Sequence, residues 1–217
     1  MRWLADNIGT VKDAVEAHLL LALPAILLSF VLAIPVAWLA NRYRWSRFTV
    51  LLVAGLLYAV PSLPLFIVLP LVTGAGVRSS VNVVAALTLY GLALMVRSAA
   101  DALDSVPEAT TLSATAVGYG AGRRFFTVEL PLAGPALLAG LRVVAVSTVS
   151  LVTVSAVLGV SSLGMLFIDG FQRGLVAEVL TGIVATVVLA LLLDQVLALL
   201  GRRLMPWQGA SRPKAAV

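Results

Sequence analysis

The sequence predicts an all-α membrane protein, a polytopic bundle of transmembrane helices that forms a single domain over residues 1–217. Of the 217 residues, 61% are hydrophobic and only 12% are charged, whereas soluble domains carry about 25% charged residues. Apolar stretches of about 20 residues recur along the chain, and each is long enough to cross a bilayer as a helix. The cations flank these stretches instead of forming a basic face, so the net charge of +5 indicates topology and not nucleic-acid binding.

Five spans are expected within a transmembrane core over residues 18–200. They lie at about residues 18–40, 48–72, 81–100, 132–158 and 175–200. Residues 1–17 are expected to form a short amphipathic lead-in, because their apolar side chains recur at near-helical spacing. Residues 201–217 are the expected cytoplasmic tail.

The second expected span contains three prolines, Pro61, Pro64 and Pro70. Each proline removes an amide donor and disturbs the preceding helical turn. Broken backbone at membrane depth is tolerated only where it is buried in protein or lines a wet cavity. Two interpretations stay open: a kinked packing helix, or a break at Pro61, Ser62 and Pro64 that borders a translocation path.

The distribution of cations predicts a multi-pass cell-membrane protein with its N-terminus outside and its C-terminus in the cytoplasm. Ten cations lie on one predicted side: Arg42, Arg44, Arg47, Arg97, Arg123, Arg124, Arg202, Arg203, Arg212 and Lys214. Four lie on the other: Arg2, Lys12, Arg78 and Arg173. The loop at residues 101–131 is therefore expected in the cytoplasm.

The chain has no cysteine and a single histidine, His18. Disulfides, thiolate metal sites and histidine-clustered metal centres are thereby excluded. We expect no metal and no cofactor in this chain, and any energy-supplying part must be a separate protein.

The loop at residues 101–131 is too long for a simple connection between helices. Pro107 can begin a helix, and Glu108 complements its positive end. Gly118 then allows a positive-φ turn, and Pro131 can begin the fourth span. The loop therefore predicts a short helix, a glycine turn and a second short helix, followed by exposed cationic and aromatic groups at Arg123, Arg124, Phe125 and Phe126. It is either an interfacial anchor or a docking segment for a cytoplasmic partner, since aromatic and arginine side chains suit such contacts.

This loop resembles the signature of the permease subunits of ATP-binding-cassette (ABC) importers: Glu-Ala-Ala, three residues, Gly, nine residues, then Ile-x-Leu-Pro. Aligning Leu130 and Pro131 with the final pair places Gly118 on the glycine. The Glu-Ala-Ala triplet then falls on Leu112, Ser113 and Ala114. Leu112 departs from the glutamate of the family, and Glu108, one turn earlier, is a candidate to replace it.

The resemblance covers residues 18–200. In detail, the sequence is similar to osmoprotectant permeases, the glycine betaine, carnitine and choline group. It is carried by "VPSLPLFIVLPLVTGAG", by "ALTLYGLALMVRSAADALDSVP", in which Arg97 matches, and by "GPALLAGLRVVAVSTVSLVTVSAVLGVSSLGMLFIDGFQRG". It implies the transmembrane domain of a type I, methionine-permease-like importer, with a coupling helix within residues 101–131.

The resemblance also implies the partners of this chain. They are two ATPase subunits that hold ATP and Mg²⁺, a second permease copy or a related permease, an extracytoplasmic substrate-binding protein, and the bilayer. The chain lacks the GxxxxGK[ST] phosphate loop, so it is not the ATPase and no catalytic residue is expected. Another small solute, such as an amino acid or another betaine, stays open as the substrate, as does a channel-like protein without nucleotide coupling.

Polar residues inside the spans are the remaining candidates, because intramembrane charge is costly. Arg142 lines a path or latches a gate, or is satisfied within the bundle. Arg97 and Tyr90 are further path candidates, and Tyr90 together with Tyr58 offers aromatic faces to a cation. Asp194 is expected to pair with Arg202. A further i,i+4 pair is expected between Asp169 and Arg173.

Overall fold

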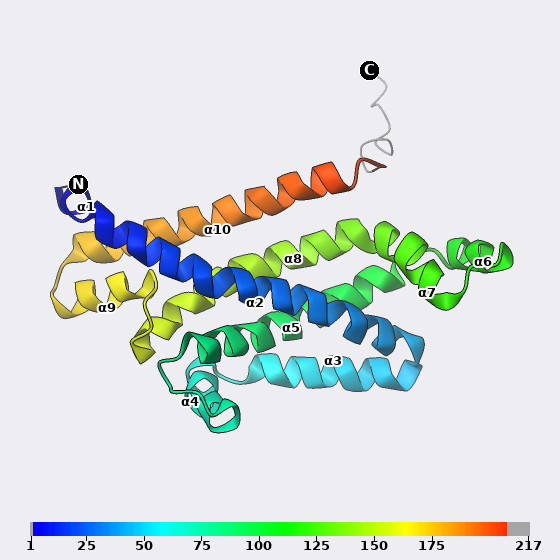
Figure 1. Cartoon of the computed structure of the whole chain (residues 1–217), viewed down its shortest axis with the longest axis horizontal. Coiled ribbons are helices and arrows are strands. Elements are labelled where there is room, and N and C mark those ends of the chain that lie inside the picture. The colour runs from blue at the N-terminus through cyan, green and yellow to red at the C-terminus, as the bar shows by residue number, and fades with distance from the viewer. Residues whose placement is uncertain (1, 208–217) are drawn as a thin grey trace, which may run out of the picture.

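The computed structural model describes residues 2–207, and these contain helices and no strand, which confirms the all-α prediction (Figure 1). Four helical stretches are long and apolar enough to cross a membrane: Ile8–Arg42 (α2), Ser80–Asp104 (α5), Ala121–Leu158 and Val176–Leu204 (α10). A bent pair, α3 (Arg44–Ala59) and α4 (Ser62–Thr73), is a fifth candidate.

The later part of the expected lead-in, from Ile8 on, is continuous with the first span in one helix. The short helix α1 (Arg2–Asp6) ends where the Asn7 side-chain amide donates to the Trp3 carbonyl oxygen, and α2 then runs unbroken from Ile8 to Arg42. Residues 18–40 are therefore the later part of a 35-residue helix. No proline stands between Ile8 and His18, and Gly9 lies in the first turn of α2, so nothing ends the helix before His18.

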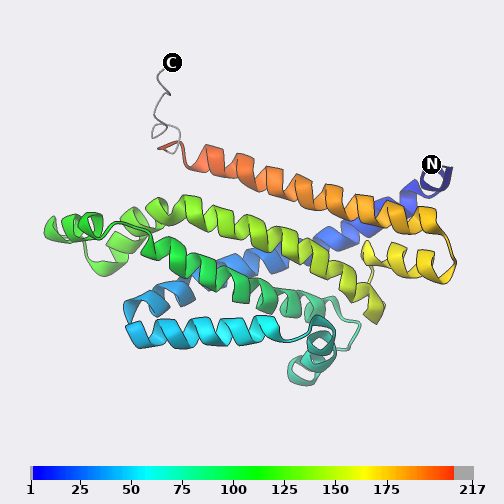
Figure 2. The same ribbon diagram turned by 180° about the vertical axis from the view of Figure 1, so that it is seen from behind.

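Helices α2, α5 and α8 (Leu130–Val152) form the centre of the bundle, with α3 on one side and α10 on the other (Figures 1 and 2). The buried face of α2 is a ridge of small residues that includes Ala25, Ser29, Ala33 and Ala37. Small residues let membrane helices approach closely. At Gly91 of α5 the approach is so close that an added Cβ would lie 2.2 Å from the Ser29 hydroxyl oxygen.

The second expected span, over residues 48–72, is broken within its proline-containing part. The α3 and α4 axes differ by 107°, so the chain turns a corner at Val60 and Pro61. Both residues have extended backbone, with ψ angles of 130° and 138°. The residue before a proline is sterically driven away from the helical region, so Pro61 ends α3, and α4 then begins at Ser62.

At its C-terminal end, helix α8 changes from an α-helix to a 3-10 helix. It continues as a 3-10 helix, η2 (Thr153–Leu158), which ends at Gly159 with φ of +77°. The Thr153 amide donates to the Ser150 carbonyl oxygen and not to Val149, its partner in a continuing α-helix. His18 of α2 hydrogen-bonds to the Val149 oxygen instead, through its Nε2 at 3.0 Å. The Nδ1 of His18 accepts from the Leu163 amide.

The last two helices, α9 (Gly164–Gln172) and α10, follow η2. Helix α9 packs on η2 and α10 at the end of the bundle that holds α1 (Figure 1). Helix α10 covers the expected fifth span and continues to Leu204, so the expected tail begins within it. Residues 208–217 of that tail lie outside the described residues.

Candidate functional sites: the α6–α7 segment and the α3–α4 corner

The predicted helix, glycine turn and second helix are confirmed. Helix α6 (Glu108–Ala116) begins directly after Pro107, Gly118 takes φ of +90°, and α7 (Ala121–Arg124) follows. The segment projects from one end of the bundle, opposite α1 and α9 (Figures 1 and 2). It leads into α8 through a π-helical turn, η1 (Phe125–Glu129).

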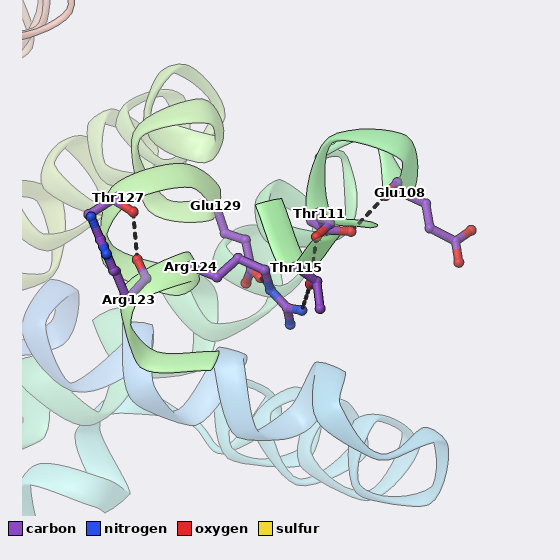
Figure 3. Close-up of polar contacts among 7 residues, drawn as sticks. All are labelled: Glu108, Thr111, Thr115, Arg123, Arg124, Thr127 and Glu129. Atoms are coloured by element: carbon purple, nitrogen blue, oxygen red, sulfur yellow. Dashed lines mark hydrogen bonds and ion pairs between the residues drawn. The ribbon is translucent and has the colours of Figure 1, made fainter. Parts of the chain in front are cut away.

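The Arg124 side chain links two parts of the α6–α7 segment to each other (Figure 3). Its Nε lies 2.6 Å from Glu129 Oε1 and its Nη1 lies 2.9 Å from Thr115 Oγ1, so one side chain joins α6 to η1. Arg124 and Glu129 are five residues apart, which is the hydrogen-bond period of a π-helix. The ion pair and the π-turn therefore support each other, and Arg124 is turned toward its own chain.

Three large apolar side chains are exposed on the segment, together with polar residues such as Glu108 and Arg123. Leu112 is 61% exposed, Val117 74% and Phe126 68%. The Arg123 guanidinium lies 4.4 Å from the centre of the Tyr119 ring, in cation–π range. This surface, made of Leu112, Val117, Arg123 and Phe126, is called the α6–α7 tip below.

The other residues selected from the sequence occupy different positions in the segment. Phe125 is buried and packs at 5.5 Å between ring centres against Trp38 of α2, so the exposed aromatic side chain is Phe126. Ala114 is also buried, and the Ser113 hydroxyl donates to the Ala109 carbonyl oxygen on the exposed side of α6. Glu108 is exposed in the first turn of α6, and half-buried Leu130 and Pro131 begin α8.

A cluster of ion pairs fastens the helix ends beneath the α6–α7 segment. Arg47 of α3 contacts Asp101 at 2.9 Å and Asp104 at 2.8 Å, both in the last turn of α5. The Asn41 amide of α2 donates to the Ala100 carbonyl oxygen at 2.7 Å. The end of α5 that leads into α6 is thus held to both α2 and α3.

Four residues that the sequence suggested as path candidates lie together at the α3–α4 corner: Pro61, Ser62, Pro64 and Tyr90. Val60 carries the carbonyl that a continuing helix would pair with residue 64, but Pro64 has no amide hydrogen. The Tyr90 hydroxyl of α5 donates to this Val60 oxygen instead. Pro61, Ser62 and Pro64 therefore lie at one bend that Tyr90 secures.

Beside this corner is a hollow of about 520 Å³ between α3, α4, α5 and α8. It is lined by Tyr58, Ser62, Tyr90, Ser147 and Ser150 together with three aliphatic residues. Its volume falls within the usual range of small-molecule sites, about 300–1,000 Å³.

Arg142, the arginine within the fourth span, pairs with Asp194, which the sequence had suggested as a partner of Arg202. Arg142 of α8 and Asp194 of α10 form a two-pronged ion pair, with both nitrogen–oxygen distances at 2.6 Å. The expected Asp194–Arg202 pair is wrong, because eight residues of helix separate the two by about 12 Å. Arg97, the other arginine selected, is exposed on α5.

The expected Asp169–Arg173 ion pair is also wrong. Arg173 stands at the end of α9, and its Nη1 lies 3.7 Å from Glu178 Oε2 at the start of α10. The Arg173 amide still donates to the Asp169 carbonyl oxygen at 2.9 Å, but the arginine side chain reaches the following helix and not the Asp169 carboxylate.

The bundle of apolar helices, the broken second span and the projecting α6–α7 segment define a membrane permease. Residues 25–206 match the binding-protein-dependent transport system inner membrane components, and the chain belongs to that family, the permease subunits of ABC importers. The match confirms the resemblance seen in the sequence and decides against the channel-like alternative.

Relatives with assigned roles cover most of the chain. The osmoprotectant import permease protein OsmW of Salmonella typhimurium is 31% identical over 189 residues, covering 83% of this chain and 86% of its own. The glycine betaine/carnitine/choline transport system permease protein OpuCD of Bacillus subtilis is 29% identical over 168 residues, covering 77% and 72%.

Among solved structures, a chain of the MetNI methionine ABC transporter in an inward facing conformation matches with a TM-score of 0.74. It is 18% identical and covers 95% of this chain and 99% of its own. At this identity the match shows the fold alone, which is that of a type I ABC importer permease.

Proposed function

We propose that this ABC importer permease carries osmoprotectant quaternary amines such as glycine betaine, carnitine or choline. The observation that carries the proposal is the 31% identity to an osmoprotectant import permease across 83% of the chain. Permease proteins named for glycine betaine, carnitine and choline transport are similar over 77% and 78% of the chain.

The proposed orientation places the α6–α7 tip in the cytoplasm and the N-terminus outside. The α2–α3 connection, the α6–α7 segment and the end of α10 lie at the same end of the bundle (Figures 1 and 2). These connections carry Arg42, Arg47, Arg123, Arg124 and Arg202. A cluster of cations at one membrane face marks the cytoplasmic side.

The proposed role of the α6–α7 tip is contact with a separate ATPase, which holds ATP and Mg²⁺. Family membership implies an ATPase and a substrate-binding protein as partners. We further propose that two ATPase subunits serve a pair of permeases, formed by a second copy or a related chain. This chain then contributes the path and its coupling but no catalytic residue.

Uptake by the reconstituted transporter tests the substrate. The permease, its ATPase and its binding protein are placed in proteoliposomes, and ATP-dependent uptake of glycine betaine, carnitine and choline is compared with that of methionine. Uptake of at least one quaternary amine is expected. Transport of methionine alone would overturn the substrate proposal.

Co-purification tests the coupling role. Phe126→Ala removes the exposed aromatic side chain of the tip and is expected to weaken retention of the ATPase. Phe171→Ala is the matched control, because Phe171 is 84% exposed on α9 at the opposite end. Equal retention of the ATPase by both variants would contradict the docking role.

A further inference from the structure

The hollow beside the α3–α4 corner combines aromatic rings with unused hydroxyl groups. Tyr58 is 49% exposed, and its ring meets that of Tyr90 edge to face at 6.2 Å. The Tyr90 hydroxyl is already committed to the Val60 carbonyl oxygen, which fixes its ring against α3. Tyr58 therefore remains as an aromatic surface available to a visiting solute.

Three serines line the same hollow, Ser62 on α4 with Ser147 and Ser150 on α8. A serine within a helix commonly turns back to bond a carbonyl of the preceding turn, as Ser29 does with Ala25. Among the described residues, no protein group forms a hydrogen bond with the side-chain hydroxyl of Ser62, Ser147 or Ser150. Their donors and acceptors are free for a ligand.

The hollow has no net charge. None of its lining residues is an aspartate, glutamate, lysine or arginine. The nearest cation along α8 is Arg142, one turn before Val146, and Asp194 neutralises it with two contacts of 2.6 Å. A strongly hydrated ion would lose its water here without a compensating partner.

A methylated ammonium compound suits this chemistry. Aromatic faces attract quaternary ammonium groups, and serine hydroxyls can donate to a carboxylate. Without a full countercharge such a site holds its ligand weakly, which a transport path requires so that the ligand can also leave.

We propose that this hollow is a transient binding site inside the permease for the quaternary ammonium solute, with Tyr58 facing the methylated nitrogen and Ser147 and Ser150 donating to the carboxylate. Tyr90 is the positioning residue, since it secures the corner that shapes the hollow. The inference rests on the proposed osmoprotectant function and names the part of the membrane domain that would recognise the substrate.

The role of Tyr58 is tested in the complete transporter with its ATPase and binding protein in proteoliposomes. Tyr58→Leu is expected to lower the maximal rate of glycine betaine uptake about tenfold, between the effects of an exposed and a fully desolvated cation–π contact. KM should stay unchanged if the binding protein sets it, and ATP hydrolysis stimulated by the binding protein reports that the complex is intact. Tyr58→Phe keeps the ring and is expected to transport at nearly the wild-type rate.

The outcomes separate this inference from the proposed function. A wild-type transporter that imports no quaternary amine refutes the proposed function. A wild-type transporter that imports glycine betaine, with Tyr58→Leu equal to wild type or Tyr58→Phe as slow as Tyr58→Leu, refutes the binding site alone.

The serine contribution is tested by the choice of solute. Glycine betaine carries a carboxylate and choline does not, so Ser147→Ala combined with Ser150→Ala should slow glycine betaine uptake and spare choline uptake. Thr181→Ala on α10, outside the hollow, is the control for loss of a hydroxyl. An equal loss for both solutes would show that the serines act in packing, and would overturn their assignment to the carboxylate.

Discussion

Replacing His18 with leucine removes a polar link at the centre of the bundle with little change in side-chain volume. The ring is fully buried and joins three segments: α2, the end of α8 and the turn before α9. Because the Leu163 amide donates to Nδ1, the single ring proton lies on Nε2 and is donated to the Val149 oxygen. Leucine can make neither contact.

The expected loss of stability is about 2–4 kcal/mol. Hydrogen bonds between membrane helices average about 0.6 kcal/mol each, so the two bonds together give about 1 kcal/mol. The larger part comes from the Val149 carbonyl, which lies at the change from α to 3-10 helix where the Thr153 amide has turned away. A buried polar group left without a partner costs about 1–3 kcal/mol.

Thermal unfolding measures the effect, and the four tryptophans supply the fluorescence signal. For a chain of this size, 1 kcal/mol shifts Tm by about 2–4 °C, so His18→Leu should lower Tm by about 4–16 °C. His18→Gln retains one donor and one acceptor and should recover part of the loss. A Tm for His18→Leu within about 1 °C of wild type, or glutamine no better than leucine, would refute the reasoning.

Three further predictions concern other parts of the molecule. Leu112→Glu, which restores the usual residue of the signature at an exposed position, should leave the ATPase retained on purification, and loss of the complex would show that the partner's groove is apolar there. Gly164→Ala should abolish the monodisperse gel-filtration peak, because the new Cβ would lie 2.0 Å from a backbone oxygen. Gly55 has open space around it, so Gly55→Ala should keep the peak. Equal behaviour of the two variants would contradict the packing argument. Asp194→Asn should reduce the yield of folded protein by leaving Arg142 uncompensated, and adding Arg142→Gln should restore it; a double variant no better than the single one would exclude the ion pair as the cause.

The fold could be predicted from the sequence where it depends on local properties. Runs of apolar residues predict spans because a bilayer demands internally bonded helices, and the order and number of spans followed from them. Gly118 and Pro131 likewise predicted the shape of the α6–α7 segment, since their backbone preferences act within a few residues. The three prolines indicated a disturbed second span, but neither the 107° angle nor the contact of Val60 with Tyr90, 30 residues away, has a local signal.

The positions of individual side chains could not be predicted in the same way. Phe125 and Phe126 are neighbours in the sequence, and only the packing of η1 on α2 distinguishes Phe125, which contacts Trp38, from exposed Phe126. Asp194 pairs with Arg142 across two helices, 52 residues apart, a contact with no local signal. A five-residue spacing between opposite charges, as in Arg124 and Glu129, is the one sequence feature that could have indicated the π-turn.

The α6–α7 segment and the hollow are joined by the same two helices. Helix α5 carries Tyr90 and ends at Asp104, three residues before α6, and the 14 residues between Tyr90 and Asp104 extend about 21 Å. Helix α8 begins directly after η1 and reaches Ser147 about 26 Å further on. Because Arg124 ties α6 to η1, the α6–α7 segment is linked to α8 as well as to α5. A displacement of the α6–α7 tip would therefore reach the hollow through both α5 and α8, which is the route that the proposed coupling to an ATPase requires.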